Sequence, residues 1–424
     1  TAKSVPFVAN VFRWVNGQNQ LIPLYQRNAD GSYILDAAGN KQYTSAAEQN
    51  GSVVGPTGGP TSTANLDYIL NHDKDETISN DINIRGYVEA KFLKDFTFQA
   101  NLSTDQTFAM RSRYWNPVTG SAVSTSGAWG QNYSEYNNIN TQQTLNWAHD
   151  YGKHHVDAMI GHEFNWNRSY GLNYKTQTSL IPDFQAFTNF LALNGGATFS
   201  GIGGGIDEEA LEGYFMRANY NYDNKYYVTA SVRTDGSSKF RYNKWGYFPS
   251  AAIAWDIAQE SFMSNQHVLD QLKLRASFGV TGNQDIAAYS TLGMLSGASY
   301  GWGTSTSSTG YWGNQFATPD ITWEKTYQYD LGLDLSLGGF NITVDWFKKQ
   351  TKDLLFQKQV PKYNGGGTYW VNQGKLNNTG VEMSLTTFPV KGAVTWETSL
   401  NASYVKNEVA DLAGDDFVLT ANYS

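Results

Sequence analysis

The stretch that decides the fold is residues 225–284, which reads KYYVTASVRTDGSSKF at 225–240 and LKLRASFGVTGNQ at 272–284. In the first run apolar side chains alternate with polar ones from Val228 to Arg233, and the same alternation runs from Leu272 to Thr281. Successive side chains of a β-strand point to opposite faces, so each run has one apolar and one polar face. At about 3.3 Å per residue and a tilt near 40°, ten residues rise roughly 25 Å, the height of a membrane barrel's apolar band. These runs are therefore predicted to be membrane-spanning strands.

The composition excludes several other classes of protein. The chain has 424 residues, a net charge of -8 and no cysteine, with 15% aromatic and only 16% charged residues. A mildly acidic chain is a poor binder of the nucleic-acid phosphate backbone, so no nucleic-acid partner is expected. Without cysteine there is neither a disulfide scaffold nor thiol chemistry. No window approaches 18 consecutive apolar residues, so no transmembrane helix is expected.

The connections between alternating runs fall into two length classes. The predicted strands are 82–92, 96–107, 139–150, 154–166, 212–222, 226–235, 248–256, 272–282, 327–337, 340–351, 380–388 and 393–406. Within each successive pair the connection is short, except for 257–271, which could hold a helical turn. Between pairs lie long loops, at 108–138, 167–211, 236–247, 283–326 and 352–379. Outer-membrane barrels have short turns on one rim and long loops on the other. The predicted fold is therefore an all-β, transmembrane antiparallel β-barrel with long extracellular loops.

Half-solvated strands of a large soluble β-protein would also alternate. Globular strands usually run about 5 to 6 residues, however, whereas most of these runs reach ten or more. Aromatic residues such as Tyr226, Trp245, Trp255 and Trp396 also gather near strand ends, as in the interfacial girdles of membrane barrels. Strand length and girdles together favour the membrane barrel.

The cost of charge in lipid predicts which face is wet. An Arg or Lys that faces lipid at the bilayer midplane costs about 2–4 kcal/mol. The charged strand residues are therefore expected to face the lumen, and Leu331 and Leu333 to meet lipid. The predicted lumen-facing residues are Arg85, Arg233, Lys273, Arg275, Asp330 and Asp334.

Aromatic residues in the long loops are the best candidates for ligand contact. Aromatic faces stack on the C–H surfaces of sugars, while the neighbouring amides bind hydroxyls. The candidates are Trp115, Trp129, Trp302, Trp312, Tyr369 and Trp370. The alternative is that these rings belong to the girdles or pack against a partner protein, where Trp and Tyr are also enriched.

Metal and catalytic sites are weakly indicated. His154 and His155 point to opposite faces, and His162 lies about 26 Å further along the strand, so no zinc site is expected. The acidic groups at 73–76 and 207–209 could be paired catalytic carboxylates or solvated loop residues, and the second interpretation is favoured. Calcium in one of these loops stays open, and no other cofactor is expected. No nucleophile elbow is present, so an enzyme is not expected.

Three blocks of sequence carry a family resemblance. They are residues 225–240, the segment WGYFPS at 245–250 and residues 272–284, supported by FLKDF at 92–96. In order and spacing they resemble the barrel of SusC/RagA-type TonB-dependent outer-membrane transporters. The resemblance implies a bacterial outer-membrane location and import of nutrient oligomers, glycan or peptide, driven through the TonB complex. It also implies outer-membrane lipids and a SusD-like surface lipoprotein as partners, with a dimer of transporter–lipoprotein pairs as one possible assembly.

The resemblance also predicts the domain organisation. Plugged barrels of this kind have about 22 strands, whereas about twelve are counted here. Residues 1–81 are expected to form an extracellular loop region with a short hairpin, 82–406 the membrane hairpins, and 407–424 the start of another loop. The plug domain and the closing strands are expected to lie outside this chain. A passive porin and a soluble β-rich glycan-binding protein are the alternative functions.

Overall fold

The structure is a computed structural model, and it describes most of the strand-forming part of the chain. The described residues are 24–43, 66–116, 122, 127–177, 198–266, 268–302, 306–361, 363, 365–390, 392 and 394–411. The chain divides into two compact units. The first comprises Thr1–Asn83, Thr104–Asn138 and Arg168–Asp207, and the second comprises Ile84–Ser103, Ile139–Asn167 and Glu208–Ser424.

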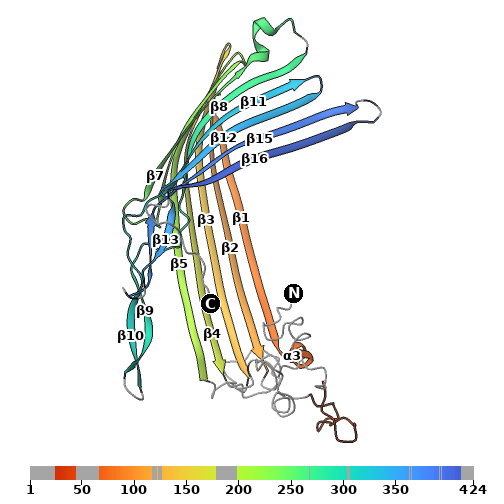
Figure 1. Cartoon of the computed structure of the whole chain (residues 1–424), viewed down its shortest axis with the longest axis vertical. Helices are drawn as coiled ribbons and strands as arrows, with labels where there is room; N and C mark the ends of the chain where they lie inside the picture. The colour runs from red at the N-terminus through yellow and green to blue at the C-terminus, as the bar shows by residue number, and fades with distance from the viewer. Residues whose placement is uncertain are drawn as a thin grey trace. The chain divides into compact units, whose positions relative to one another are not determined.

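Twelve strands form one sheet, in the order β1-β2-β3-β4-β5-β6-β7-β8-β11-β12-β15-β16 (Figure 1). The first six are β1 (Lys74–Phe92), β2 (Phe96–Trp115), β3 (Ala128–Tyr151), β4 (His154–Gln177), β5 (Thr198–Tyr222) and β6 (Tyr226–Ser237). The other six are β7 (Trp245–Asp256), β8 (Leu269–Asn283), β11 (Glu324–Leu337), β12 (Phe340–Lys352), β15 (Lys375–Val390) and β16 (Trp396–Asp411). The printed registers from β5 to β16 are all antiparallel. The predicted all-β fold and the order of the hairpins are confirmed.

The short turns lie where the sequence places them. Asp223 and Asn224, between β5 and β6, adopt φ angles of 52° and 55°, and Gly338 and Gly339, between β11 and β12, adopt 54° and 90°. Asn, Asp and Gly tolerate this left-handed region better than other residues, which is why they form tight turns. The longer connection between β7 and β8 holds two 3-10 turns, η3 (Ile257–Gln259) and η4 (Ser261–Met263), as predicted.

The strands extend beyond their predicted ends on the long-loop side. β2 continues to Trp115 and β3 begins at Ala128, while β4 continues to Gln177 and β5 begins at Thr198. Much of the sequence predicted as loops at 108–138 and 167–211 is therefore strand. β1 likewise begins at Lys74 rather than at residue 82. Backbone pairing continues beyond the stretch of regular alternation, into segments such as 201–209, where Gly and acidic residues interrupt the apolar face.

A second, four-stranded sheet was also missed. It has the order β13-β14-β10-β9 and lies in segments predicted as loops. Its strands are β9 (Met294–Trp302), β10 (Thr306–Gln315), β13 (Leu355–Gln359) and β14 (Thr368–Asn372). β9 and β10 form an antiparallel hairpin (Figure 1). β14 joins β10 in parallel through Gln315 and Thr368. The Ser- and Gly-rich sequence of β9 and β10 carries no clear alternation, so its strand character was not visible.

The part of the first unit before β1 contains short irregular elements. Residues 24–43 are held by the antiparallel bridges Tyr25↔Tyr43, Arg27↔Tyr33 and Leu35↔Lys41. A short helix, α3 (Leu66–His72), precedes β1. Among the described residues, no helix has both the length and the apolar character needed to cross a bilayer.

The main hydrophobic core lies at the long-loop end of β6, β7, β8 and β11. Phe248 on β7 and Val280 on β8 meet Phe240, Ile286, Ile321 and Trp323 from the adjoining loops. The Trp323 ring packs edge-on against Phe240 and Phe248, with centroids 5.4 Å apart in both cases. Its Nε1 donates a 2.8 Å hydrogen bond to the Lys244 carbonyl. Loop residues are thus anchored onto the sheet, which fixes the loops from which the small sheet emerges.

Candidate functional site

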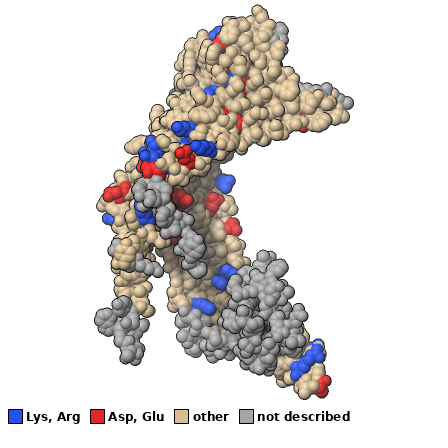
Figure 2. Space-filling model, in the orientation of Figure 1, with Lys and Arg blue, Asp and Glu red and all other residues tan. Residues whose placement is uncertain are grey.

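The strands of the second unit have two chemically different faces. Cross-strand partners share a face, and Arg233 pairs with Phe248, Ser277 with Asp330, and Gly332 with Arg275. Following these registers puts Arg233, Lys273, Arg275, Asp330 and Asp334 on one face, here called the polar face. The apolar face is opposite and includes Val232, Ile253, Leu274, Leu331 and Trp346. Charged side chains are sparse over the visible surface of β11 to β16 (Figure 2).

Two aromatic girdles bound the apolar face. At the short-turn end, Tyr226 stacks on Trp255 with centroids 6.3 Å apart. At the long-loop end, Tyr214 meets Trp245 with centroids 6.1 Å apart, and Trp245 pairs with Gly236. Tyr226 and Gly236 are ten residues apart on β6, so the girdles are separated by roughly 25 Å at a 40° tilt. This spacing matches the apolar band of an outer-membrane barrel.

On the polar face, Arg275 forms the centre of an ion-pair cluster that joins three strands. Its Nε donates to Asp334 Oδ2 at 2.8 Å, and its Nη2 donates to Asp345 Oδ1 at 2.9 Å. The guanidinium crosses β11 above Gly332, where a Cβ would lie 2.7 Å from Arg275 Cζ and closer still to Asp345 Oδ1. The absence of a side chain at Gly332 is therefore what lets the arginine lie flat and reach β12.

A second arginine uses the same arrangement. Arg233 on β6 donates to Asp235 at 2.8 Å and, across β5, to Glu163 Oε2 on β4 at 3.1 Å. It crosses β5 above Gly213, where a Cβ would lie 2.6 Å from Arg233 Nη2. Arg233 and Arg275 are thus not brought together, but each is paired to two carboxylates over a glycine.

Of the remaining predicted lumen residues, Lys273 and Asp330 have individual partners. Lys273 lies over the Tyr227 ring, 4.2 Å from its centroid. Asp330 accepts hydrogen bonds from Ser277 at 3.1 Å and Gln328 at 2.9 Å. Arg85 lies on β1 on the face opposite Ile84, as strand alternation requires. That this charged face lines the lumen stays a prediction.

Two of the predicted ligand aromatics have environments that oppose ligand contact. Trp129 is only 1% exposed and packs against Tyr114 and Tyr174. Its assignment as a contact residue is therefore corrected, because a buried ring offers no stacking surface. Trp115 has Arg113 Cζ at 5.4 Å and Lys175 Nζ at 4.9 Å from its ring, so cations already lie over this ring. Residues 114–115 and 128–129 are strand rather than loop.

The other four candidates belong to the small sheet. Trp312 on β10 is 40% exposed, whereas Trp370 on β14 packs against the hydrophobic core and Tyr369 is half-buried. Trp302 ends β9, and its side chain lies outside the described residues. Phe316, 42% exposed and directly after β10, was not among the candidates, although its position beside the predicted aromatics could have suggested it. Tyr311, at 75%, is more exposed than either.

The two acidic groups are partly in strands and already hydrogen-bonded. Asp75 on β1 pairs with Arg111 Nε at 2.7 Å, and Glu209 on β5 pairs with Lys239 Nζ at 2.8 Å. Asp73 precedes β1 and accepts a 2.8 Å hydrogen bond from the Asn116 amide. Burial raises the pKa of Asp73 to about 6, against the lowering effect of the Asn116 hydrogen bonds. Among the described residues, no group of three or more His, Asp or Glu side chains is arranged to hold a metal ion.

Residues 9–423 match the family described as "TonB dependent receptor-like, beta-barrel". The chain belongs to this family. Curated relatives agree, including TonB-dependent receptors P3 and P39 of Formosa agariphila, each 31% identical, over 78% and 86% of this chain. The TonB-dependent receptor SusC of Bacteroides thetaiotaomicron is 29% identical over 85% of it. The chain spans only about a third of each relative, 34%, 34% and 36% respectively.

Solved structures agree on the fold. The RagAB peptide importer in its closed-closed state matches with a TM-score of 0.73 at 23% identity, over 91% of this chain and 40% of that one. Its open-open state gives 0.73 at 22% identity, over 92% of this chain and 43% of that one. The family match makes the chain a transmembrane β-barrel segment of the bacterial outer membrane rather than a soluble glycan-binding protein. Members of this family are transport proteins rather than enzymes.

Proposed function

We propose that this chain forms part of the wall and extracellular mouth of a TonB-dependent importer of nutrient oligomers, with the polar face lining the lumen. The amphipathic wall favours a pore, because its charged residues lie on one face and its apolar residues, bounded by the two aromatic girdles, lie on the other. Within the part of the chain that the structure describes, β1 and β16 are the end strands of the sheet, which supports closure by further strands, because a barrel leaves no free edge in lipid. About ten further strands would complete a barrel of about 22.

The small sheet of the second unit is the observation that supports the proposed substrate class. It presents Tyr311, Trp312 and Phe316 with exposures of 75%, 40% and 42%. Polar residues accompany these rings: Gln315 pairs with Thr368 beside them, and its Nε2 donates to the carbonyls of Ser290 and Leu292. Rings with polar neighbours suit a glycan, whose C–H faces stack while its hydroxyls are hydrogen-bonded. A peptide is the second candidate class, and the neighbouring structure is of a protein described as a peptide importer.

The partners follow from the same proposal. A SusD-like surface lipoprotein would cover the extracellular loops, and the TonB complex would act through a plug domain outside this chain. A dimer of transporter–lipoprotein pairs is the expected assembly. The SusC relative and the RagAB neighbours support this set of partners.

The test is uptake by cells that carry the complete protein. Deleting its gene should abolish growth on one class of glycan oligomer while growth on the monomer continues, and deleting TonB should have the same effect. In the intact protein, Trp312→Ala should weaken binding of that oligomer about tenfold, which corresponds to the loss of one ring contact worth about 1.4 kcal/mol. Tyr329→Ala on the apolar face is the matched control and should leave binding unchanged.

Three outcomes separate the alternatives. Uptake that continues without TonB would indicate a passive porin. If the deletion strain failed to grow on peptides but grew on glycans, the protein would still be an importer, but its substrate would be a peptide. Normal growth of the deletion strain on every oligomer would refute the importer.

A further inference from the structure

A cluster of cations lies around one tryptophan at the long-loop ends of β2 and β4. Arg111 and Arg113 are two positions apart on β2, so both lie on the same face as Trp115. Arg113 Cζ is 5.4 Å from the centroid of the Trp115 ring, and Lys175 Nζ, from β4, is 4.9 Å from it. The ring crosses β3 above Gly130, where a Cβ would lie 3.4 Å from its Cζ3. It thereby joins cations from two strands that are not neighbours.

The carboxylates of the described residues neutralise only part of this cationic cluster. Asp75 binds Arg111 through both of its oxygens, at 2.7 Å and 2.5 Å. Within the described ranges, no carboxylate lies within ion-pair distance of Arg113. A tryptophan ring attracts a cation but has no net charge, so Arg113 keeps its positive charge. Its guanidinium has a fork of N–H donors that matches a carboxylate or sulfate.

The cationic cluster lies on the polar face of the sheet. Asn101 on β2 donates to Gln142 on β3 at 3.4 Å, and Asn140 on β3 donates to Glu163 on β4 at 3.4 Å. Glu163 in turn accepts from Arg233. Odd-numbered residues of β2 and β4 therefore share the face of Arg233, and the cations of the cluster are all at odd-numbered positions. In the proposed barrel this face lines the lumen.

The strands that carry the cluster are packed together on their other face. There Tyr114 and Trp129 are each 1% exposed and pack with Tyr174. The Tyr174 hydroxyl also donates to Gln131. Because Tyr114 precedes Trp115 directly on β2, this packing fixes the backbone from which the ring projects. Charged groups on a backbone that is already fixed lose less conformational entropy when they bind a ligand.

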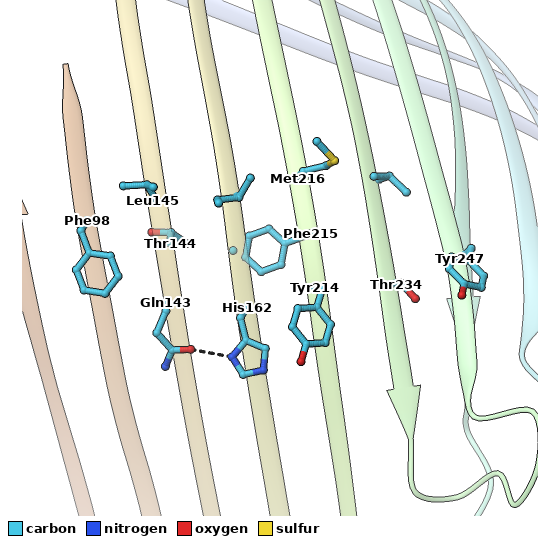
Figure 3. Close-up of a pocket in the computed structure, with 13 residues that line it drawn as sticks. Phe98, Gln143, Thr144, Leu145, His162, Tyr214, Phe215, Met216, Thr234 and Tyr247 are labelled. Carbon is cyan, nitrogen blue, oxygen red and sulfur yellow. Dashed lines mark hydrogen bonds between the residues drawn. The ribbon is translucent and has the colours of Figure 1, made fainter.

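A cavity of about 670 Å³ on the apolar face, between β2 and β7, is the alternative place for a ligand (Figure 3). Its lining includes Ile160, Met216 and Val232, and the Nδ1 of His162 lies 2.8 Å from Gln143 Oε1. In the proposed barrel the apolar face meets lipid, so this cavity is not open to a water-soluble oligomer. The cationic cluster is therefore the better candidate for recognition of the imported molecule.

We propose that the cationic cluster binds a carboxylate or sulfate of the imported oligomer, so that the substrate is an acidic glycan rather than a neutral one. This inference rests on the proposed function, because it assigns a charge to the glycan of that importer. The anion accepts hydrogen bonds from the Arg113 guanidinium and lies beside Lys175, and Trp115 holds both cations in position.

The first measurement is growth of the gene-deletion strain on oligomers that the parent strain uses. Oligogalacturonate and a sulfated galactan oligomer are the acidic probes, and xylan and glucan oligomers are the neutral ones. Growth should be lost on an acidic oligomer and continue on the neutral ones. Growth lost only on a neutral oligomer, or only on peptides, would overturn this inference and leave the importer intact. Normal growth on every oligomer would refute the importer itself.

The second measurement is binding of the acidic oligomer by the intact, detergent-purified protein. The same oligomer after carboxyl reduction, or after desulfation, is the neutral form. The wild type should bind the acidic form about tenfold more tightly, the difference expected for one charge-assisted pair. Carboxyl reduction that removes the preference identifies a carboxylate, and desulfation that removes it identifies a sulfate. Equal affinity for the acidic and neutral forms would overturn the proposal.

The variants locate the site. Arg113→Gln should remove most of the preference for the acidic form, whereas Lys74→Gln, which removes the same charge from the other face of β1, should keep it. Trp115→Leu keeps every charge and should lower the preference without changing the affinity for the neutral form. Heat-modifiable gel mobility checks folding, and if Arg113→Gln does not fold, Lys175→Gln serves as the second variant and should reduce the preference. An unchanged preference in the folded variant would overturn the proposal.

Discussion

The polar and the apolar face of the same strands differ in the charged side chains that they carry. On the polar face each of two arginines is paired with two carboxylates and lies over a glycine of the next strand. On the apolar face of β6, β7, β8 and β11, between the girdles, the side chains are Val, Ala, Ile, Leu and aromatic residues, with Pro249 and Thr234. Backbone pairing is shared by both faces, so the faces differ only in their side chains. Because side chains alternate with a period of two, each strand has one polar and one apolar face.

The most direct way to break this comparison is to place a charge on each face of one strand. Leu333→Arg puts a guanidinium on the apolar face of β11 and should destabilise the folded barrel by about 2–4 kcal/mol. Gln328→Arg puts the same group on the polar face beside Asp330 and should change stability little. Urea-induced unfolding in lipid vesicles measures both. Equal costs for the two variants would show that the faces are not distinguished by lipid.

A third environment for charge lies outside both faces, at Asp73. Because burial raises its folded pKa to about 6 from 3.8, the folded state holds the proton more tightly than the unfolded chain does. Stability of this region is therefore greatest below about pH 4, falls as the pH rises to about 6 and stays low above it, by up to about 3 kcal/mol. Asp73→Asn should remove this dependence and make the region more resistant to proteolysis at pH 7. A wild type whose proteolysis rate is constant from pH 4 to 7 would contradict it.

Two glycine substitutions test whether the flat arginine on the polar face depends on the glycine beneath it. Gly332→Ala should displace the Arg275 guanidinium and the Asp345 carboxylate, and it should cost about 0.5–1 kcal/mol, because only a partly solvated ion pair is disturbed. Gly86→Ala on β1 is the control, since a Cβ there meets nothing within 4 Å and its cost should be near zero. Thermal unfolding of both variants in detergent gives the difference. If Gly332→Ala melts like the wild type, the flat arginine is not held by that glycine.

Alternation was sufficient to predict the wall, its hairpins and its turns. The runs around Val228 and Leu274 have a period of two because one face is apolar and the other polar, and that pattern is local to each strand. The same argument fails above the girdles. There Tyr170, Leu172 and Tyr174 of β4 still alternate with polar residues and glycine, but Gly and acidic residues interrupt the alternation of β5 at 201–209. The sequences of β9 and β10 are rich in Ser and Gly, so they carry little periodic signal.

The candidate site was less predictable for a different reason. Which carboxylates Arg275 would meet depends on the register between β8, β11 and β12, and register is a long-range property. The burial of Trp129 depends on Tyr114 and Tyr174, which come from two other strands. Composition suggested aromatic loop contacts, but only the fold separates an exposed Trp312 from a buried Trp129.

The arginine-over-glycine arrangement also bears on the width of the passage that this wall would enclose. An upright arginine would project into the passage and sweep through it. Arg233 lies over Gly213 and Arg275 lies over Gly332, and each guanidinium is hydrogen-bonded to carboxylates. Both side chains therefore lie flat against the sheet. The lining can thus carry charged groups that project little into the passage. A large oligomer could then pass without long side chains having to rotate out of its way.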